Sequence, residues 1–144
     1  MDYTIRPVEP GDAPGIAALR RMPGVFENTL GLPSCRTADS AAFLASLGPN
    51  DHNFVAAAED GTIIAAAGLQ VCSNPRMRHV GSIGLFVHTD YQNQGVGTAL
   101  MKAILDLADN WLMLVRVELE VFADNERAIR LYEKFGFEKE GLLR

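Results

Sequence analysis

The chain has 144 residues, of which 48% are hydrophobic and 22% charged, and this length fits one domain covering residues 1–144. Such usage excludes collagen-like, low-complexity and disordered chains. Two cysteines without metal-like Cys/His spacing exclude a disulfide scaffold, and we expect no metal. The 13 Lys and Arg against 18 Asp and Glu give a formal net charge of −5, which argues against nucleic-acid binding because phosphate contacts need clustered cations.

The sequence shows neither a signal peptide nor a membrane span. Asp2, Arg6 and Glu9 stand near the N-terminus with no apolar region between them. The longest strongly apolar run, residues 63–69, is far shorter than the about 20 residues that cross a bilayer. These features predict a cytoplasmic protein.

The first half of the chain predicts an antiparallel sheet with two early helices. The helices and the opening strand are bounded by Pro and Gly: a strand at 3–8, a helix from 11–12 to a break at 23–24, a loop at 28–36, and a helix from Asp39 or Ser40 to 47. The apolar runs 53–58 and 63–71 flank Asp60-Gly61, which is a strong hairpin signal. A third strand at 79–88 completes a meander.

The second half alternates helices and strands. The predicted elements are a loop at 92–97, a long helix ending at Trp111, a half-buried strand at 115–121, a helix capped by Asp124-Asn125 and ended by Gly136, and a last strand at 137–143. Strand–helix–strand alternation after a meander predicts an α/β fold with a mixed sheet, antiparallel early and partly parallel late.

The loop between residues 92 and 97 is suited to a phosphate. Gly95 and Gly97 stand two apart at a helix N-terminus, where backbone N–H groups and partial positive charge favour anions. The Lys of a P-loop and the third glycine of a dinucleotide fingerprint are both missing. A simple tight turn before a helix is the alternative interpretation of the two glycines.

Two segments carry a resemblance to a known family. Gln92–Leu100 resembles the pyrophosphate loop Q/R-x-x-G-x-G/A of the GCN5-related N-acetyltransferases, and Asn125–Phe137 resembles the later motif of that family. The opening Ile5-Arg6-Pro7 followed by Asp12 is also typical of it. Within the family, residues 28–33, 109–112 and 121–125 resemble a bacterial branch of L-amino-acid N-acetyltransferases.

The resemblance implies acetyl-CoA as cosubstrate and the acyl-CoA N-acyltransferase fold. It implies that Leu85–Val87 splay from residues 119–121, that freed backbone groups of Phe86 and Val87 pair with pantetheine, and that an amide near Leu85 polarises the acetyl carbonyl. Gly84 would then mark a bulge. The implied cofactor-binding residues are Leu85, Phe86, Val87, Gln92, Asn93, Gln94, Gly95, Val96, Gly97, Thr98 and Asn125.

Tyr132 is the candidate catalytic residue that the resemblance implies. A phenol with a pKa of about 10 can protonate a departing thiolate at neutral pH. Tyr132 also lies on the apolar stripe of its predicted helix, so core packing is the alternative, and Asn125 has the same choice between helix cap and cofactor contact.

No general base can be named from the sequence. Many relatives place an acidic residue before the glycine loop, whereas this chain has Ser82–Leu85 there. Glu118, Glu120, His79 and His88 lie on or beside the neighbouring strands, but a solvated face is the favoured interpretation of each. As candidate substrate residues we name Asn28, Thr29 and Glu118.

The expected function is acetylation of a primary amine of a small molecule, with the α-amino group of an amino acid as one candidate acceptor. The alternatives are a protein N-terminus, a Lys side chain, a polyamine, or a non-catalytic acyl-CoA sensor. Against the family pattern the C-terminal strand is missing, because the chain ends with its sixth strand where relatives continue into a seventh. An uncovered strand edge favours association, which predicts a homodimer.

Overall fold

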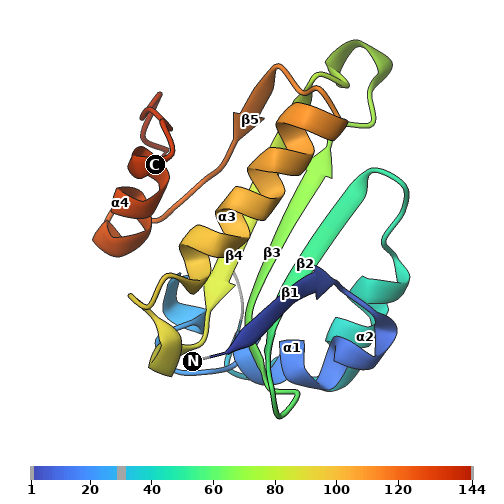
Figure 1. The fold of residues 1–144 in the computed structure, drawn as a ribbon, viewed down its shortest axis with the longest axis vertical. Coiled ribbons are helices and arrows are strands. Elements are labelled where there is room, and N and C mark those ends of the chain that lie inside the picture. The colour runs from blue at the N-terminus through green and yellow to red at the C-terminus, as the bar shows by residue number, and fades with distance from the viewer. Residues whose placement is uncertain (1, 29–31, 144) are drawn as a thin grey trace.

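The computed structural model describes residues 2–28 and 32–143. Five strands form one sheet in the order of the chain (Figure 1). They are β1 (Tyr3–Pro7), β2 (Asp51–Ala58), β3 (Ile63–Val71), β4 (Val80–Val87) and β5 (Arg116–Glu118). The first four strands are antiparallel neighbours and β5 lies parallel to β4. The predicted mixed α/β sheet is therefore confirmed.

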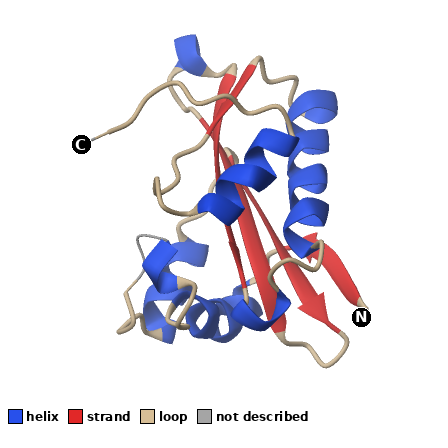
Figure 2. Cartoon of the chain, turned by 90° about the vertical axis from the view of Figure 1, so that its left-hand side faces the viewer, coloured by secondary structure: helices blue, strands red, loops and turns tan. Residues whose placement is uncertain are grey.

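Helices cover both faces of this sheet (Figure 2). They are α1 (Ala13–Arg20), α2 (Thr37–Ala45), α3 (Val96–Asp106) and α4 (Glu126–Lys134). Ile16 and Leu19 of α1 pack in one buried cluster, while Leu100 and Ile104 of α3 pack in the other. Burial of each such side chain contributes about 1.5–3 kcal/mol, so these two stripes fix the helices against opposite faces.

The β2–β3 hairpin forms where Asp60-Gly61 predicts it. Gly61 adopts a φ of +90°, which a residue with a side chain rarely tolerates, and its N–H donates to the Ala58 carbonyl at 2.9 Å. The Asp60 carboxylate accepts from the Thr62 N–H at 3.0 Å. A register shift does occur in this hairpin, between Ala56 and Ala57.

The predicted bulge at Gly84 is wrong. The β3–β4 register runs unbroken from Ala65–Val87 to Val71–Gly81, with Gly84 opposite Gly68. Gly68 leaves room for the Asn53 side chain of β2, which lies 3.0 Å from the place where a Gly68 Cβ would stand, whereas a Cβ at Gly84 would meet nothing within 4 Å.

Two helix boundaries also differ from expectation, the start of α2 and the end of α3. The second helix begins at Thr37, because the Asp39 carboxylate accepts from the Arg36 N–H at 3.0 Å and so belongs to the first turn. The long helix leaves the α conformation at Leu107, where a π turn runs to Trp111 and the Leu112 N–H donates to the Leu107 carbonyl at 2.9 Å.

The C-terminal part departs most from expectation. The strand predicted at 115–121 covers only 116–118, and the described residues 137–143 contain no strand. Leu142 and Leu143 are exposed, so this segment lacks the buried apolar face that would pack a strand against the rest of the protein. It is held instead by the Glu140 carboxylate, which accepts two bonds from the Arg116 guanidinium, one of them at 2.5 Å.

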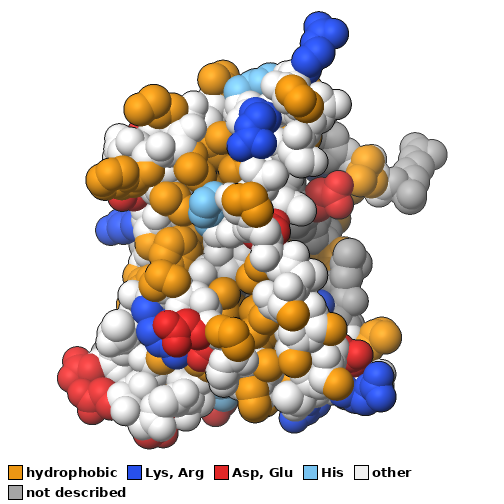
Figure 3. Space-filling model, turned by 90° about the vertical axis from the view of Figure 1, so that its right-hand side faces the viewer, with side chains coloured by type: hydrophobic (Ala, Val, Ile, Leu, Met, Phe, Trp, Pro, Cys, Tyr) orange, Lys and Arg blue, Asp and Glu red, His pale blue; other side chains and the backbone are white. Residues whose placement is uncertain are grey.

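The outer surface is mixed in character. Figure 3 shows hydrophobic side chains scattered over one face, with Lys and Arg atoms in separate groups rather than in a stripe. Within residues 2–28 and 32–143, no helix has both the length and the apolar character needed to cross a membrane.

Candidate active site

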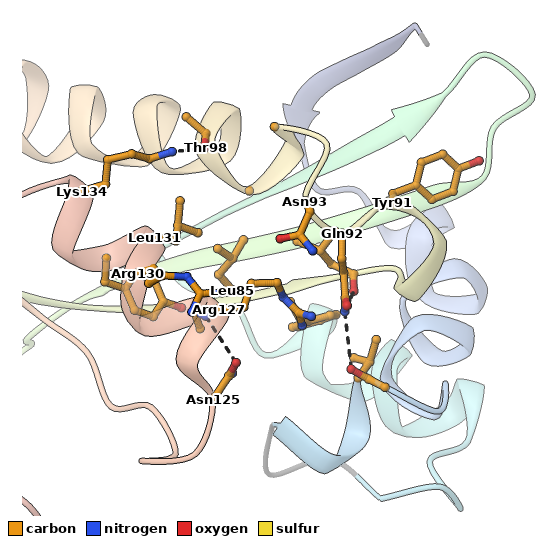
Figure 4. A pocket seen from close by; sticks show the side chains of 18 residues that line it. Leu85, Tyr91, Gln92, Asn93, Thr98, Asn125, Arg127, Arg130, Leu131 and Lys134 are labelled. Atoms are coloured by element: carbon orange, nitrogen blue, oxygen red, sulfur yellow. Dashed lines mark hydrogen bonds between the residues drawn. The ribbon is translucent and has the colours of Figure 1, made fainter.

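A cavity of about 430 Å³ lies between β4, the loop that leads into α3, and α4 (Figure 4). It brings together residues from three stretches that are far apart in the sequence, 24–25, 85–98 and 125–134. The sequence-predicted residues that line it are Leu85, Phe86, Val87, Gln92, Asn93, Gly95, Gly97, Thr98, Asn125 and Tyr132. Its volume is within the range of about 300–1,000 Å³ that small-molecule sites have.

Three predicted residues do not line this cavity. Val96 is fully buried at the start of α3, and the Gln94 amide donates to the Asp90 carbonyl at 2.9 Å. Glu118 lies on β5 and accepts from Arg116 at 3.0 Å. Asn28 ends a 3₁₀ turn that begins at Phe26, and Thr29 lies outside the described residues.

The edge of β4 opens toward the cavity. The parallel ladder between β4 and β5 ends at Ser82–Glu118, so the last residues of β4 have no ladder partner on that side. The splay between 85–87 and 119–121 that the family resemblance implies is thus present. A gap next to unpaired strand backbone can accept an extended ligand as an added strand.

The backbone groups that face this gap follow from strand alternation. The Cys72 N–H donates to the Val80 carbonyl and the His88 N–H to the Ile64 carbonyl, so even-numbered residues of β4 bond to β3. Leu85 and Val87 consequently direct their backbone groups to the gap. Phe86 directs its own to β3, so the expectation of freed Phe86 backbone groups is wrong.

The Val87 carbonyl is already engaged. It accepts a hydrogen bond from the Gln92 side-chain amide at 3.1 Å. Among residues 85–87, the groups left to meet a ligand are therefore the N–H and carbonyl of Leu85 and the N–H of Val87. Both residues also pack their side chains on the α3 side of the sheet.

The two glycines of the loop are needed for different physical reasons. Gly95 caps α3 with a φ of +86°, a conformation that side chains strain, and space around its Cβ position is open. A Cβ at Gly97 would lie 3.2 Å from Leu131 Cδ2 and 3.7 Å from Leu85 Cδ2. Gly97 thus permits close approach of α4 and β4, where the sequence predicts only room for a phosphate.

Three cations of α4 line the cavity and were missed by sequence reasoning. They are Arg127, Arg130 and Lys134. Their i, i+3, i+7 spacing places them along one side of the helix, a periodicity that could have revealed them. Lys134 Nζ donates to Thr98 Oγ1 at 3.4 Å, across from the first turn of α3.

This cavity is positively charged although the chain is acidic. No Asp, Glu or His stands among the described residues that line it. The nearest carboxylate to Arg130 is that of Glu126, at 4.0 Å on the exposed side of α4. Cations and the N-terminus of α3 together favour a ligand with several phosphate charges.

The position of Tyr132 is compatible with both interpretations made from the sequence, core packing and a place in the active site. Its ring packs edge-on against Phe137 with centroids 6.0 Å apart, and only 8% of the residue is exposed. It also lines the cavity. Burial raises the pKa of the phenol above its ordinary value of 10.0, so the group stays protonated and neutral at physiological pH.

Asn125 likewise combines two positions. Its Oδ1 accepts from the Ala128 N–H at 3.3 Å and so caps α4, while the residue lines the cavity (Figure 4). The cap fixes the start of the helix that carries Tyr132 and the cations.

Comparison with known proteins identifies the family. Residues 24–137 match the model described as the Acetyltransferase (GNAT) family. The chain belongs to the GNAT family. The match includes the glycine loop, the β4 edge and α4, which are the segments that build the cavity.

Relatives of this GNAT chain support the assignment. It is 33% identical to the L-amino acid N-acetyltransferase AaaT of Escherichia coli over 97% of its own length and 85% of that protein. It is 35% identical to the N-alpha-acetyltransferase RimI of Mycobacterium tuberculosis over 72% and 63% of the two chains. The protein is therefore an acetyl-CoA-dependent N-acetyltransferase.

Solved GNAT structures share its fold. An acetyltransferase of Streptococcus pneumoniae superposes with a TM-score of 0.81 at 27% identity, covering 97% of this chain and 87% of the other. A spermidine N-acetyltransferase of Vibrio cholerae, solved with CoA and spermine, gives a TM-score of 0.82 at 21% identity, covering 96% and 82%.

Proposed function

We propose that this GNAT enzyme acetylates the primary amine of a small molecule, with the α-amino group of an amino acid as the acceptor. The observation that carries the proposal is a single cavity that joins an anion-binding end to a gap lined by Tyr132 and unpaired β4 backbone. The similarity to an L-amino acid N-acetyltransferase over nearly the whole chain supports this acceptor class.

The residues of the cavity fit acetyl-CoA. Backbone N–H groups from Gln92 to Thr98 would hold the pyrophosphate at the start of α3, with the α4 cations opposite. The backbone of Leu85 and Val87 would pair with the amides of the pantetheine arm. Acetyl-CoA supplies the activated thioester, and the chain supplies binding, orientation and protons.

Two groups of the chain are assigned chemical roles. The Leu85 N–H faces the gap, where it would donate to the acetyl oxygen as negative charge develops there. The Tyr132 hydroxyl would give its proton to the departing sulfur and regain one from the amine that has been acetylated. A C–N bond forms and the C–S bond breaks. The acetyl group thus passes from sulfur to nitrogen, and one proton passes from the amine to the thiol.

The acceptor amine must lose its own proton before it attacks. Because no carboxylate or imidazole lines the described part of the cavity, no residue is assigned as base. Deprotonation would then occur through water, so the rate is expected to rise with pH along the neutral fraction of the amine.

A panel assay tests the acceptor class. Purified protein and acetyl-CoA are mixed with the twenty amino acids, spermidine, spermine and N-terminal peptides, and free thiol is followed at pH 7 to 9. We expect thiol release above background with at least one amino acid, increasing with pH. Turnover confined to polyamines or peptides would overturn the acceptor class. Tight CoA binding without thiol release for any amine would favour a sensor.

We further propose that the protein self-associates through the β5 end of the sheet. β5 pairs with β4 on one side, and the described chain places no strand on its other side. Trp111, Met113 and Val115, which precede β5, are 73%, 76% and 83% exposed. Exposed apolar side chains beside an open strand edge favour contact with a second copy.

Light scattering after size exclusion tests this surface. We expect the wild type to elute as a dimer and Val115→Lys to shift toward monomer, whereas Phe43→Lys on α2 should leave the mass unchanged. Phe43 is a matched control because it is also an exposed apolar residue, at 50%. A wild type that is still monomeric at about 100 μM, well above the Kd of a dimer of micromolar affinity, would contradict the proposal.

A further inference from the structure

Pro23 to Val25, the turn that follows α1, forms one wall of the cavity. Gly24 and Val25 line it, although sequence reasoning treats Pro23-Gly24 only as the end of a helix. The turn belongs to the connection from 21 to 36 between α1 and α2. No ladder of the sheet fixes it, so its position depends on other contacts.

Two side chains from the loop after β4 hold this turn. Thr89 Oγ1 donates to the Pro23 carbonyl at 2.6 Å. Gln92 Nε2 reaches the Gly24 carbonyl at 3.5 Å (Figure 4). These bonds join residues that are 66 and 68 positions apart in the chain. Gly24 fits closely here, since a Cβ on it would lie 2.7 Å from Thr89 Oγ1 and its φ is +87°.

The turn lies on the opposite face of the sheet from the phosphate-binding end. Val25 is 2% exposed and packs in the cluster of α1, together with Phe86. Leu85 and Val87 pack in the cluster of α3, on the side where α4 carries its cations. The cavity reaches both faces through the gap beside β4.

This geometry separates the places of the two substrates. A thioester held in the gap, with its phosphates on the α3 and α4 side, is open to attack from the face of α1. The amine would therefore approach along the turn at 23–25. A wall displaced by an ångström would misalign the amine with the carbonyl while leaving phosphate contacts intact.

We propose that Thr89 is a positioning residue whose hydroxyl fixes the Pro23–Val25 turn as the amine-side wall of the active site. This rests on the function proposed above. Gln92 supports the same turn while its backbone belongs to the pyrophosphate loop. The loop that holds the cofactor thus also sets the position of the acceptor.

Thr89→Ala and Thr89→Ser test this inference, because the two variants differ by one oxygen atom. Loss of one hydrogen bond is worth about 1 kcal/mol, or about fivefold in an equilibrium. With the amine that the panel assay identifies, we expect Thr89→Ala to lower kcat/KM for the amine about fivefold. The KM for acetyl-CoA should stay within about twofold, and Thr89→Ser should restore the wild-type value.

A second measurement does not depend on turnover. Arg21 and Arg36 are exposed and bracket the connection, so trypsin can report on its opening. We expect cleavage after these residues to be several-fold faster in Thr89→Ala than in Thr89→Ser or wild type. Equal cleavage in all three proteins would overturn the positioning role, as would a rise confined to the acetyl-CoA KM. If no amine is acetylated, the proposed function fails, and the cleavage rates still decide whether the hydroxyl holds the turn.

Discussion

Replacement of Tyr132 by Phe is expected to lower kcat about 100-fold, the lower end of what a positioned general acid contributes. The departing thiolate would then have to take its proton from water. Acetyl-CoA affinity should change by less than about twofold, because the ring and its packing on Phe137 are retained. Initial rates with the best amine and calorimetric titration with CoA separate these two effects.

The pKa of Tyr132 adds a check on its role. Since burial raises this pKa, the acid form persists through the pH range of an ordinary assay, and the wild type should show no alkaline loss of kcat below about pH 10. Because the pKa is higher in the folded state, the neutral phenol also adds to the free energy of unfolding. This contribution is fully present below pH 10.0 and is lost as the pH rises through the pKa of the folded state. An unchanged kcat in Tyr132→Phe would sink the acid assignment.

The second large effect is expected when two positive charges of α4 are reversed. The double variant Arg127→Glu/Arg130→Glu should raise the KM for acetyl-CoA about 100-fold, because two charge-assisted contacts of about 1.5 kcal/mol each are lost. At saturating acetyl-CoA, kcat should stay within about threefold, since neither guanidinium is assigned to the reacting atoms. Steady-state kinetics over a wide range of acetyl-CoA concentration measure both quantities.

Arg76→Glu/Lys139→Glu is the matched control for this variant. Both residues are exposed and stand outside the cavity, and either double variant changes the net charge by −4, from −5 to −9. We expect the control to retain the wild-type KM and the α4 variant to lose most of the salt dependence of that KM. Equal effects of the two pairs would mean that only the total charge of the protein matters.

Local signals in the sequence predicted much of the architecture. Asp60-Gly61 predicted its hairpin because turn geometry depends on neighbouring residues alone. Gly95 predicted the start of α3, which it caps in a left-handed conformation, and the sequence also placed Asn125 at the start of α4. Tyr132 and most residues of the glycine loop then meet in one cavity, the exceptions being Gln94 and Val96.

Other features depended on contacts between distant segments. The alternating residues 115–121 form only a three-residue strand because pairing with β4 stops at Ser82, a fact of sheet geometry and not of local pattern. Likewise, the backbone direction of Phe86 follows from the register with β3. The hydrogen bond between Thr89 and Pro23 joins two turns, and the local sequence of neither turn predicts contact with the other.

The attachment of α4 has a consequence for the free energy of folding. Of its residues, Tyr132 is buried, and the described side-chain bond from α4 to α3 is that of Lys134 to Thr98. A ligand lying between the α3 loop and α4 would join two parts of the molecule that otherwise share a small contact. By linkage, a ligand at 100 times its Kd stabilises the folded state by about 2.7 kcal/mol. The cosubstrate would thus serve as part of the scaffold, and the C-terminal helix would be held most firmly while the enzyme is loaded.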